Sequence, residues 1–476
     1  MQLDFHDGTL RLRGVTAKFV ERACANLPLV SDPRDDCYRC DAMEYSRVCR
    51  CLDRHLGQPW DNLVPQVTQV HLHPKASRNL RDDQRQAIAA FWNAAGRGII
   101  VMPTGTGKTV VAIEIMLQAQ TSTLVVVPVR DLMYQWHARI LATWGVDAGL
   151  IGDGVHRVSP ISVTTYESAT IHMPRIGNRF QLVIFDEVHH LAGSWRSDAA
   201  RMCAAPMRLG LTATLPADPQ HVSTLEQLLG SIVYQQSITE AAGRSLAPYK
   251  IRRIAVAMDP AQQERYRRLG QVVQHFVRGR QEVDPRFRWD EIYKLTARTT
   301  SEPGVAAAAT TALRAFRMKK RLEERAAGKF AVLEKLLREH AADRVLVFVG
   351  SNAMARDLSL RFFAPCLLSH CGKRERADLL DGFAGGRYRV LIANQVLDEG
   401  VDLPEVKVAI VLGGMASSRQ AVQRLGRILR RSASGQQAIL YEIVTDKSGE
   451  VARSRARRRH DAFQKPARRD LPDADQ

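Results

Sequence analysis

The sequence of 476 residues predicts an α/β protein built on parallel sheets, and three observations lead to this prediction. Between residues 97 and 215, apolar runs alternate with segments of helical periodicity, which is typical of a parallel sheet covered by helices on both faces. A glycine-rich turn within residues 101–112 joins one such run to one such helix. Further apolar runs follow between residues 250 and 413. Because the chain is too long for one ordinary domain, we expect about three or four units.

The glycine-rich turn has the composition of a phosphate-binding loop. It follows the apolar run GIIVM and reads Pro103, Thr104, Gly105, Thr106, Gly107, Lys108 and Thr109. Its glycines let backbone N–H groups converge on one point, and the next helix adds its positive N-terminal end. Lys108 can reach the outer phosphates of a nucleotide, and Thr109 can place its hydroxyl on Mg²⁺. Met102 stands where the usual motif has a further glycine.

The composition favours a protein that binds a polyanion. The formal net charge is +18, and no run of about twenty apolar residues predicts a membrane span. The N-terminus lacks the apolar core of a secretory signal. Eight cysteines in so long a chain do not make a disulfide scaffold, so we expect a reducing compartment. We therefore expect a cytoplasmic protein, associated with the nucleoid if the source is prokaryotic.

The first 75 residues mix a strand pattern, TLRLRGV, with a helical pattern, AMEYSRVCRCLDRHL. Four cysteines in this part have the spacing C-x₂-C-x₈-C-x-C: Cys37, Cys40, Cys49 and Cys51. Two interpretations stay open, a zinc site and free structural thiols. The second is favoured because the last two cysteines fall in a helical stretch, where their side chains face different directions.

A pair of carboxylates follows the apolar run QLVIF, about eighty residues after the glycine-rich turn. Ligands of parallel sheets bind beyond the carboxyl ends of the strands, so both motifs belong to one edge. We assign Asp186 to Mg²⁺ and Glu187 to the orientation and deprotonation of an attacking water. His189 is a candidate for coupling the nucleotide to Thr212 and Thr214, which follow the run RLGL. An isolated Asp-Glu pair would more often be a solvated loop.

The helix start LRDDQRQAIAAFW precedes the glycine-rich turn. Its position makes Arg81 and Gln84 candidates for contact with an adenine. The alternative is a solvated helix end.

The motifs, in their order along the chain, resemble those of superfamily 2 helicases and translocases. The first half contributes PTGTGKT, PVRDLMYQW, VTTYES, DEVH and TAT, and the second half RVLVFVGS, VLIANQVLDEGVDLP and QAVQRLGRILR. The DEVHH box, DEGVDLP and QRLGRILR look most similar to the XPB-like branch, the xeroderma pigmentosum group B helicase family, in its compact prokaryotic form. That family's Arg-Glu-Asp element after TAT is unmatched, since the chain reads LPADP there. This departure puts the family's strand-separating wedge in question.

The resemblance implies two RecA-like domains in tandem with two further parts. The expected division is an N-terminal accessory, damage-recognition-like domain at 1–75, an ATP-binding helicase domain at 76–245, a C-terminal helicase domain at 246–450 and a basic, disordered tail at 451–476. A helical, thumb-like insertion that grips DNA is expected at about 260–335.

Two arginines of the segment QAVQRLGRILR look like arginine fingers. Arg427 and Arg430 are three residues apart and share a helix face, and a guanidinium matches the charge of a phosphoryl group in transfer. Gln423 would position them or the water. Gly400 and Asp402 are expected beside the ribose or the coupling face. A basic helix without catalytic duty is the alternative.

The insertion is rich in basic residues, and helices of this kind suit contact with a phosphate backbone. The candidates for this contact are Arg265, Arg267, Arg268, Arg278, Arg280, Arg286, Arg288, Arg314, Arg317, Lys319, Lys320 and Arg321. A merely solvated face is the alternative.

Together these features predict an ATP- and Mg²⁺-dependent DNA helicase or translocase with 3′-to-5′ polarity, acting in DNA repair. Three alternatives stay open: an RNA-remodelling helicase, a motor subunit for a separate nuclease partner, and a DNA-binding clamp that ATP only switches.

Overall fold

The structure is a computed structural model that describes residues 1–56, 59–64, 69–76, 79–193, 195–246, 249–296, 303–368, 370–394, 406–413 and 438–458. These residues fall into two compact units, and the chain passes from the first to the second after Leu246. None of the described helices combines the length and the apolar character that crossing a membrane requires.

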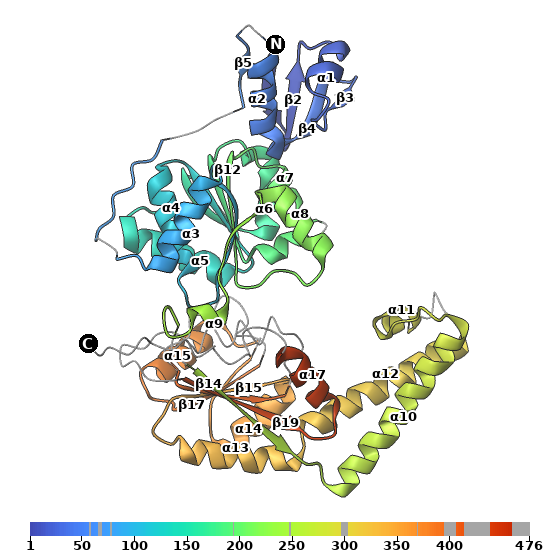
Figure 1. Ribbon diagram of the computed structural model, residues 1–476. Helices are drawn as coiled ribbons and strands as arrows, with labels where there is room; N and C mark the ends of the chain where they lie inside the picture. Colours follow the sequence, from blue (N-terminus) through green and yellow to red (C-terminus); the bar gives the residue numbers. More distant parts are fainter. Residues whose placement is uncertain are drawn as a thin grey trace, which may run out of the picture. The chain divides into compact units, whose positions relative to one another are not determined.

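The first unit begins with a small sheet and two helices (Figure 1, dark blue). Its elements are β1 (Gln2–His6), β2 (Thr9–Arg13), α1 (Ala17–Ala23), β3 (Val30–Asp32), β4 (Cys37–Asp41), the 3₁₀ turn η1 (Ala42–Glu44), α2 (Tyr45–His55) and β5 (Asp61–Asn62). The strand order is β3-β4-β2-β1-β5, and only β5 runs parallel to its neighbour. Leu10 and Leu12 of β2 pack against Val48 and Leu52 of α2, because alternate strand residues share one face.

The rest of the first unit is built on an eight-stranded sheet of order β13-β6-β12-β11-β7-β10-β8-β9. Its strands are β6 (Arg97–Val101), β7 (Thr123–Val127), β8 (Gly149–Gly152), β9 (Val155–His156), β10 (Ile161–Thr165), β11 (Leu182–Asp186), β12 (Met207–Thr212) and β13 (Ile232–Gln235). All neighbouring strands are parallel except the edge pair β8 and β9. Every residue of the central strands β7 and β11 is buried, so their continuous apolar runs are those of strands covered on both faces.

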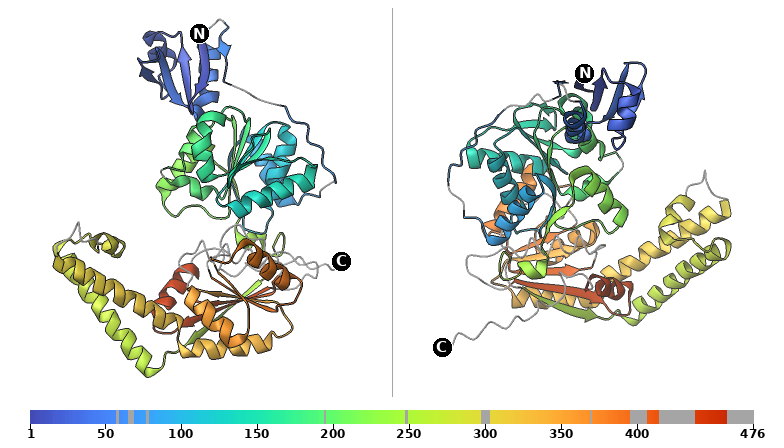
Figure 2. Two further views of the ribbon diagram at one scale, coloured as in Figure 1. Left: turned by 180° about the vertical axis from the view of Figure 1, so that it is seen from behind. Right: turned by 45° about the horizontal axis from the view of Figure 1, so that its top comes forward.

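Helices cover both faces of this sheet (Figure 2). One face packs against α3 (Asp82–Asn93), α4 (Lys108–Ala119) and α5 (Arg130–Trp144). The other packs against α6 (Tyr166–Ile176), α7 (Asp198–Arg201) and α8 (Pro219–Leu229). The 3₁₀ turn η2 (Val188–Ala192) follows β11, and α9 (Ile238–Ala241) lies near the end of the unit.

The second unit contains a six-stranded, fully parallel sheet of order β14-β19-β18-β15-β17-β16. Its strands are β14 (Tyr249–Val256), β15 (Val345–Val349), β16 (Cys366–Leu367), β17 (Val390–Ala393), β18 (Val408–Leu412) and β19 (Ala438–Thr445). Its helices are α13 (Ala327–Glu339), α14 (Asn352–Phe362), α15 (Lys373–Ala384) and α17 (Gly449–Arg458). The two parallel sheets confirm the predicted α/β architecture in tandem.

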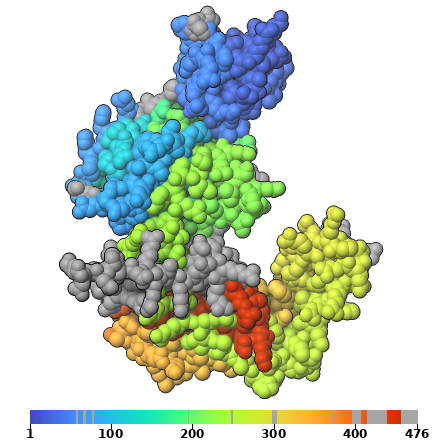
Figure 3. Space-filling model, viewed as in Figure 1, coloured from blue at the N-terminus to red at the C-terminus, as the bar shows by residue number. Residues whose placement is uncertain are grey.

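A helical hairpin is inserted between β14 and β15, and it projects from the body of its unit (Figure 3, yellow-green and yellow). It consists of α10 (Pro260–Val283), the 3₁₀ turn η3 (Trp289–Glu291), α11 (Ile292–Leu295) and α12 (Pro303–Glu324). A small core of its own, with Ile292, Ala309 and Ala312, holds the far end together. The expected insertion extended to about residue 335, but α13 packs into the core of the sheet through Leu333 and Leu336.

An ion pair inside the second unit ties α13 to α17. Lys329 is fully buried, and its Nζ donates to both carboxylate oxygens of Glu450, at 2.9 and 2.7 Å. The backbone N–H of Thr445, the last residue of β19, also donates to Glu450, at 2.8 Å. Burial lowers the pKa of Lys329, and the carboxylate opposes that shift. The pair therefore holds the start of α17 against the sheet, and because this helix runs to Arg458, residues 451–458 of the expected disordered tail are helical.

Replacing Lys329 by Met should destabilise the second unit, because Glu450 would stay buried without its cation. Removal of one partner of a buried pair costs about 3–5 kcal/mol. The exposed pair of Arg338 and Glu334 on α13 provides the control, and Arg338→Met should cost about 1 kcal/mol or less. Denaturant unfolding of both variants measures the difference, and equal losses would contradict this account of the buried pair.

Candidate nucleotide-binding site

The glycine-rich turn occupies the carboxyl end of β6, which ends at Val101, and α4 begins at Lys108. Gly105 and Gly107 have φ angles of +89° and +83°, in the left-handed region that favours glycine. A Cβ at Gly107 would also lie 2.6 Å from Nε2 of Gln84. The loop therefore needs glycine there for both its backbone conformation and its close packing.

Lys108 is nine-tenths buried at the start of α4 and points back along the loop. Its Nζ donates to the carbonyl of Met102 at 3.3 Å and lies 4.0 Å from Oε1 of Glu187. An ammonium group has three donors, so it can also serve a phosphate oxygen. Thr109, the proposed Mg²⁺ ligand, is half-buried in the first turn of the same helix.

Met102 replaces the first glycine of the usual motif because its position belongs to the core. Its side chain is fully buried in the cluster between the sheet and α3–α5. Its backbone N–H donates to the carbonyl of Thr212 at 3.0 Å, so the pairing of β6 with β12 continues up to the loop.

The two candidate adenine contacts lie against the loop. Gln84 Nε2 donates to the carbonyl of Thr106 at 3.1 Å, and the guanidinium of Arg81 donates to the same carbonyl. Gln84 Oε1 in turn accepts from the backbone N–H of Arg81 at 3.1 Å, which caps α3. Both side chains thus hold the loop in place, and their contact with an adenine stays a prediction.

Asp186 ends β11 and is held by three groups. Trp136 Nε1 donates to its Oδ2 at 2.9 Å, the backbone N–H of Glu187 donates to its Oδ1 at 2.9 Å, and the hydroxyl of Tyr166 donates to its carbonyl at 3.1 Å. Burial and the adjacent Glu187 raise the pKa of Asp186, and Lys108 acts against this. A carboxylate in such a place is suited to a nearby cation.

Glu187 has an unusual backbone conformation, with a φ angle of +50°. A non-glycine residue in this region is held there by its surroundings. Its Oε1 faces Lys108, while Oε2 is buried and accepts no hydrogen bond within the described residues. A buried carboxylate oxygen that lacks a hydrogen-bond donor can accept a hydrogen bond from a bound water molecule.

The coupling candidates form a chain from Glu187 to the end of β12. His189 Nδ1 lies 3.5 Å from Glu187 Oε2 and 3.3 Å from Thr212 Oγ1. The hydroxyl of Thr212 donates to the carbonyl of Thr214 at 2.9 Å. The structure therefore brings the three predicted residues together beside the carboxylate, while their coupling role stays a prediction.

Sequence reasoning assigned no role to Trp136 and Tyr166, the side chains that hold Asp186. Both lie in segments that carried the family resemblance, PVRDLMYQW and VTTYES. A buried indole or phenol normally finds a hydrogen-bond partner, so two aromatic residues with polar tips in these segments were the available signal.

Five further site candidates lie outside the described residues: Gly400, Asp402, Gln423, Arg427 and Arg430. Their roles therefore stay expectations.

The four cysteines of the possible zinc site are not brought together as one cluster. Cys37 and Cys40 are buried in β4, while Cys51 on α2 has its sulfur 2.9 Å from that of Cys24. Cys49 lies near Asn62, with 3.9 Å between its sulfur and Nδ2. No group of three or more potential metal ligands of the His, Cys, Asp or Glu type occurs in the part of the chain that the structure describes.

Comparison with known proteins places this arrangement in a class and then in a family. Residues 77–217 match the family "Type III restriction enzyme, res subunit", and residues 328–432 match "Helicase conserved C-terminal domain". The helicase domain of Pyrococcus furiosus Hef is a structural neighbour, with a TM-score of 0.55 and 17% identity over 80% of this chain and 99% of that one. The fold is thus that of tandem RecA-like helicase domains.

Two relatives indicate which family within the helicase class the chain belongs to. The "DNA 3'-5' translocase XPB2" of Sulfurisphaera tokodaii is 39% identical over 80% of this chain and 84% of its own length. The yeast "General transcription and DNA repair factor IIH helicase/translocase subunit XPB/SSL2" is 23% identical over 79% of this chain and 43% of its own length. The chain belongs to the XPB family of superfamily 2 helicases and translocases.

Replacing Trp136 by Phe should slow ATP turnover about tenfold, because Asp186 would lose a charge-assisted hydrogen bond worth about 1.5–3 kcal/mol. Loss of the donor should raise the pKa of Asp186 further, so the defect should grow as the pH falls from 8 toward 6. Trp144→Phe is the matched control on α5, since its indole nitrogen has no hydrogen-bond partner within the described residues. Steady-state ATPase rates of both variants across this pH range test the prediction. Parallel pH profiles of Trp136→Phe and Trp144→Phe would contradict it.

Proposed function

We propose that this chain hydrolyses ATP to move on, or open, DNA with 3′-to-5′ polarity. The observation that carries the proposal is the convergence of Lys108, Asp186 and Glu187 at the strand ends, in a chain of the XPB family. The polarity follows the printed name of the S. tokodaii relative. A role in DNA repair is proposed from the yeast relative's name, although this chain spans less than half of that protein.

The residues present fit an Mg²⁺–ATP complex. Gly105 and Gly107 keep the loop in a left-handed backbone conformation, and Thr104 Oγ1 is buried without a hydrogen-bond partner in the described part of the chain. Thr109 and Asp186 would hold the cation, which offsets phosphate charge when bound. Lys108 would contact the outer phosphates, with Arg81 and Gln84 beside the adenine.

Glu187 is assigned to the attacking water. Its Oε2, which accepts no hydrogen bond from a described residue, would accept a proton from that water and orient the water in line with the terminal phosphate. His189 contacts both Glu187 and Thr212, so a shift of the Glu187 carboxylate on hydrolysis would move His189 and, through it, Thr212 and Thr214. By the family resemblance, Arg427 and Arg430 would stabilise the charge of the phosphoryl group, with Gln423 positioning them.

The hairpin of the second unit is the proposed DNA grip, since its helices carry many exposed arginines. The first 75 residues are proposed as the accessory domain, because their sheet and helices have their own core. Phosphate contacts of this kind are independent of sequence and weaken with salt.

A second candidate function is a motor subunit that serves a separate nuclease. The description of the family matched at residues 77–217 favours it, because it names a subunit of a restriction enzyme. Copurification of a nuclease with the natural chain would support this alternative. ATP turnover stimulated more by RNA than by DNA would instead favour an RNA-remodelling helicase, and tight ATP binding without turnover a switched clamp.

Replacing Glu187 by Gln should reduce ATP turnover by roughly 100-fold or more while ATP and DNA binding persist, because the water loses its base. Glu167→Gln is the control, since that carboxylate lies on α6 and pairs with Arg196 rather than with a residue of the loop. ATPase assays with and without DNA, together with nucleotide-binding titrations, measure both. Undiminished turnover in the Glu187 variant would move the catalytic role elsewhere.

A further inference from the structure

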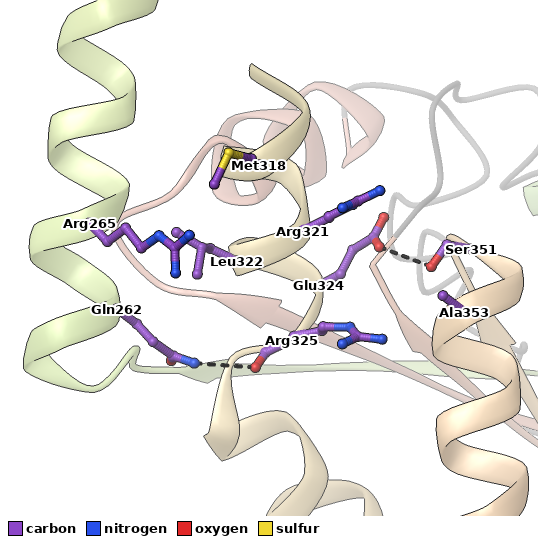
Figure 4. A pocket seen from close by; sticks show the side chains of 9 residues that line it. All are labelled: Gln262, Arg265, Met318, Arg321, Leu322, Glu324, Arg325, Ser351 and Ala353. Carbon is purple, nitrogen blue, oxygen red and sulfur yellow. Dashed lines mark hydrogen bonds between the residues drawn. The ribbon is translucent and has the colours of Figure 1, made fainter. Parts of the chain in front are cut away.

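Two features of the described chain take no part in the nucleotide-binding site. One is a hollow of about 550 Å³ at the base of the hairpin, lined by residues of α10, α12 and the start of α14 (Figure 4). Arg265 and Arg321 in its wall are exposed and belong to the proposed DNA grip. The other feature is a pair of cysteine side chains in the first unit, to which the proposed function gives no role.

Cys24 and Cys51 meet between the two helices of the N-terminal sheet domain. Cys24 directly follows α1, and its backbone N–H donates to the carbonyl of Val20, while Cys51 lies on α2. Their sulfur atoms are 2.9 Å apart. Because an S–S bond is roughly 2.05 Å long, the two sulfurs need to approach by only about 0.9 Å to form one.

The reduced pair has a defined arrangement. The thiol of Cys51 donates to the carbonyl of Ala23 at 3.1 Å, so its sulfur can accept from the thiol of Cys24. Burial, together with the contact to Cys51, raises the pKa of Cys24 to about 12, and this thiol therefore keeps its proton at neutral pH. Cys24 is buried and Cys51 is partly exposed, so a reagent from solution reaches Cys51 first.

Other cysteines of this domain have different neighbours. Cys49, on the same helix α2, has its sulfur 3.9 Å from Nδ2 of Asn62. Cys37 and Cys40 lie buried on β4. The thiol pair thus draws on Cys24, which lies outside the four-cysteine pattern that suggested zinc.

We propose that Cys24 and Cys51 form a reversible disulfide site, which a small-molecule disulfide such as oxidised glutathione converts to the bridged form. The thiolate of Cys51 attacks one sulfur of the reagent and forms a mixed disulfide, and the glutathione thiolate that leaves takes up the proton lost by Cys51. The sulfur of Cys24 then attacks the sulfur of Cys51, and its proton passes to the second glutathione as that leaves. Two protein thiols are oxidised, and one glutathione disulfide is reduced to two thiols.

The bridge would fasten α1 to α2 and close a loop over the elements between them. These elements are β3, β4 and the turn η1. Closing such a loop restricts the unfolded chain, so the bridge stabilises the folded domain. The core of this domain is small, with Leu10 and Leu12 of β2 packed against Val48 and Leu52 of α2, and a small core gains much from a single cross-link.

Peptide mapping of the full chain tests whether the bridge forms. The chain is reduced, incubated with an excess of oxidised over reduced glutathione, unfolded in N-ethylmaleimide and digested for mass spectrometry. The natural chain should yield a cross-linked peptide that contains Cys24 and Cys51. Cys51→Ser should yield none, whereas the matched control on the same helix, Cys49→Ser, should yield the same cross-link as the natural chain.

Amide hydrogen exchange of the folded chain tests what the bridge does. Oxidation of the natural chain should slow exchange in α1 and α2 by about tenfold or more, and dithiothreitol should restore the original rates. Oxidation should leave exchange in Cys51→Ser unchanged. The comparison of the oxidised and reduced natural chain involves no substitution, so it decides the matter even where a variant folds poorly.

Three outcomes would overturn the disulfide site. These are glutathione left on Cys51 without a bridge, a bridge at another pair such as Cys366 and Cys371, and equal exchange rates in the oxidised and reduced natural chain. ATP turnover is measured separately. Its absence would remove the proposed function and leave the result for the disulfide site in force.

Discussion

Two adjacent carboxylates at the end of one buried strand set the main physical constraint on this molecule. Asp186 and Glu187 follow each other directly, and burial together with the adjacent Glu187 raises the pKa of Asp186, so a nearby positive charge is needed to favour its ionised form. Lys108 supplies one such charge from the neighbouring loop, 4.0 Å from Glu187. The parallel strands of the eight-stranded sheet make this contact possible, because they bring both the loop and the carboxylates to the same edge.

Side chains around this edge of the sheet fix the position of Asp186. Trp136 and Tyr166 come from helices on opposite faces of the sheet and hold Asp186 from both sides. Glu187 Oε2, by contrast, is buried and accepts no hydrogen bond from a described residue, with His189 Nδ1 3.5 Å away. Under the proposed function, the hydrogen-bonded carboxylate of Asp186 would hold the cation, and the open carboxylate of Glu187 would take the proton of the attacking water.

In the second unit, a network of buried polar contacts anchors the charged hairpin to the sheet. The buried carboxylate of Glu323, at the end of α12, accepts from the hydroxyl of Tyr266 at 2.6 Å and from the backbone of Gly449 at 3.1 Å. Together with the pair of Lys329 and Glu450, this network joins both hairpin helices to α17. The hairpin can therefore present exposed arginines to a polyanion while its base stays anchored in the core.

The sequence by itself determined the α/β class, the positions of the main strands along the chain and the phosphate loop, because apolar runs and glycine turns are local signals. It also placed Asp186 and Glu187 at a strand end. Only the tertiary structure decided that Met102 is a core residue, that Trp136 holds Asp186 and that α13 belongs to the sheet. It also decided which two thiols of the N-terminal domain meet. These outcomes depend on which side chains meet across distant segments, and no local pattern carries that information.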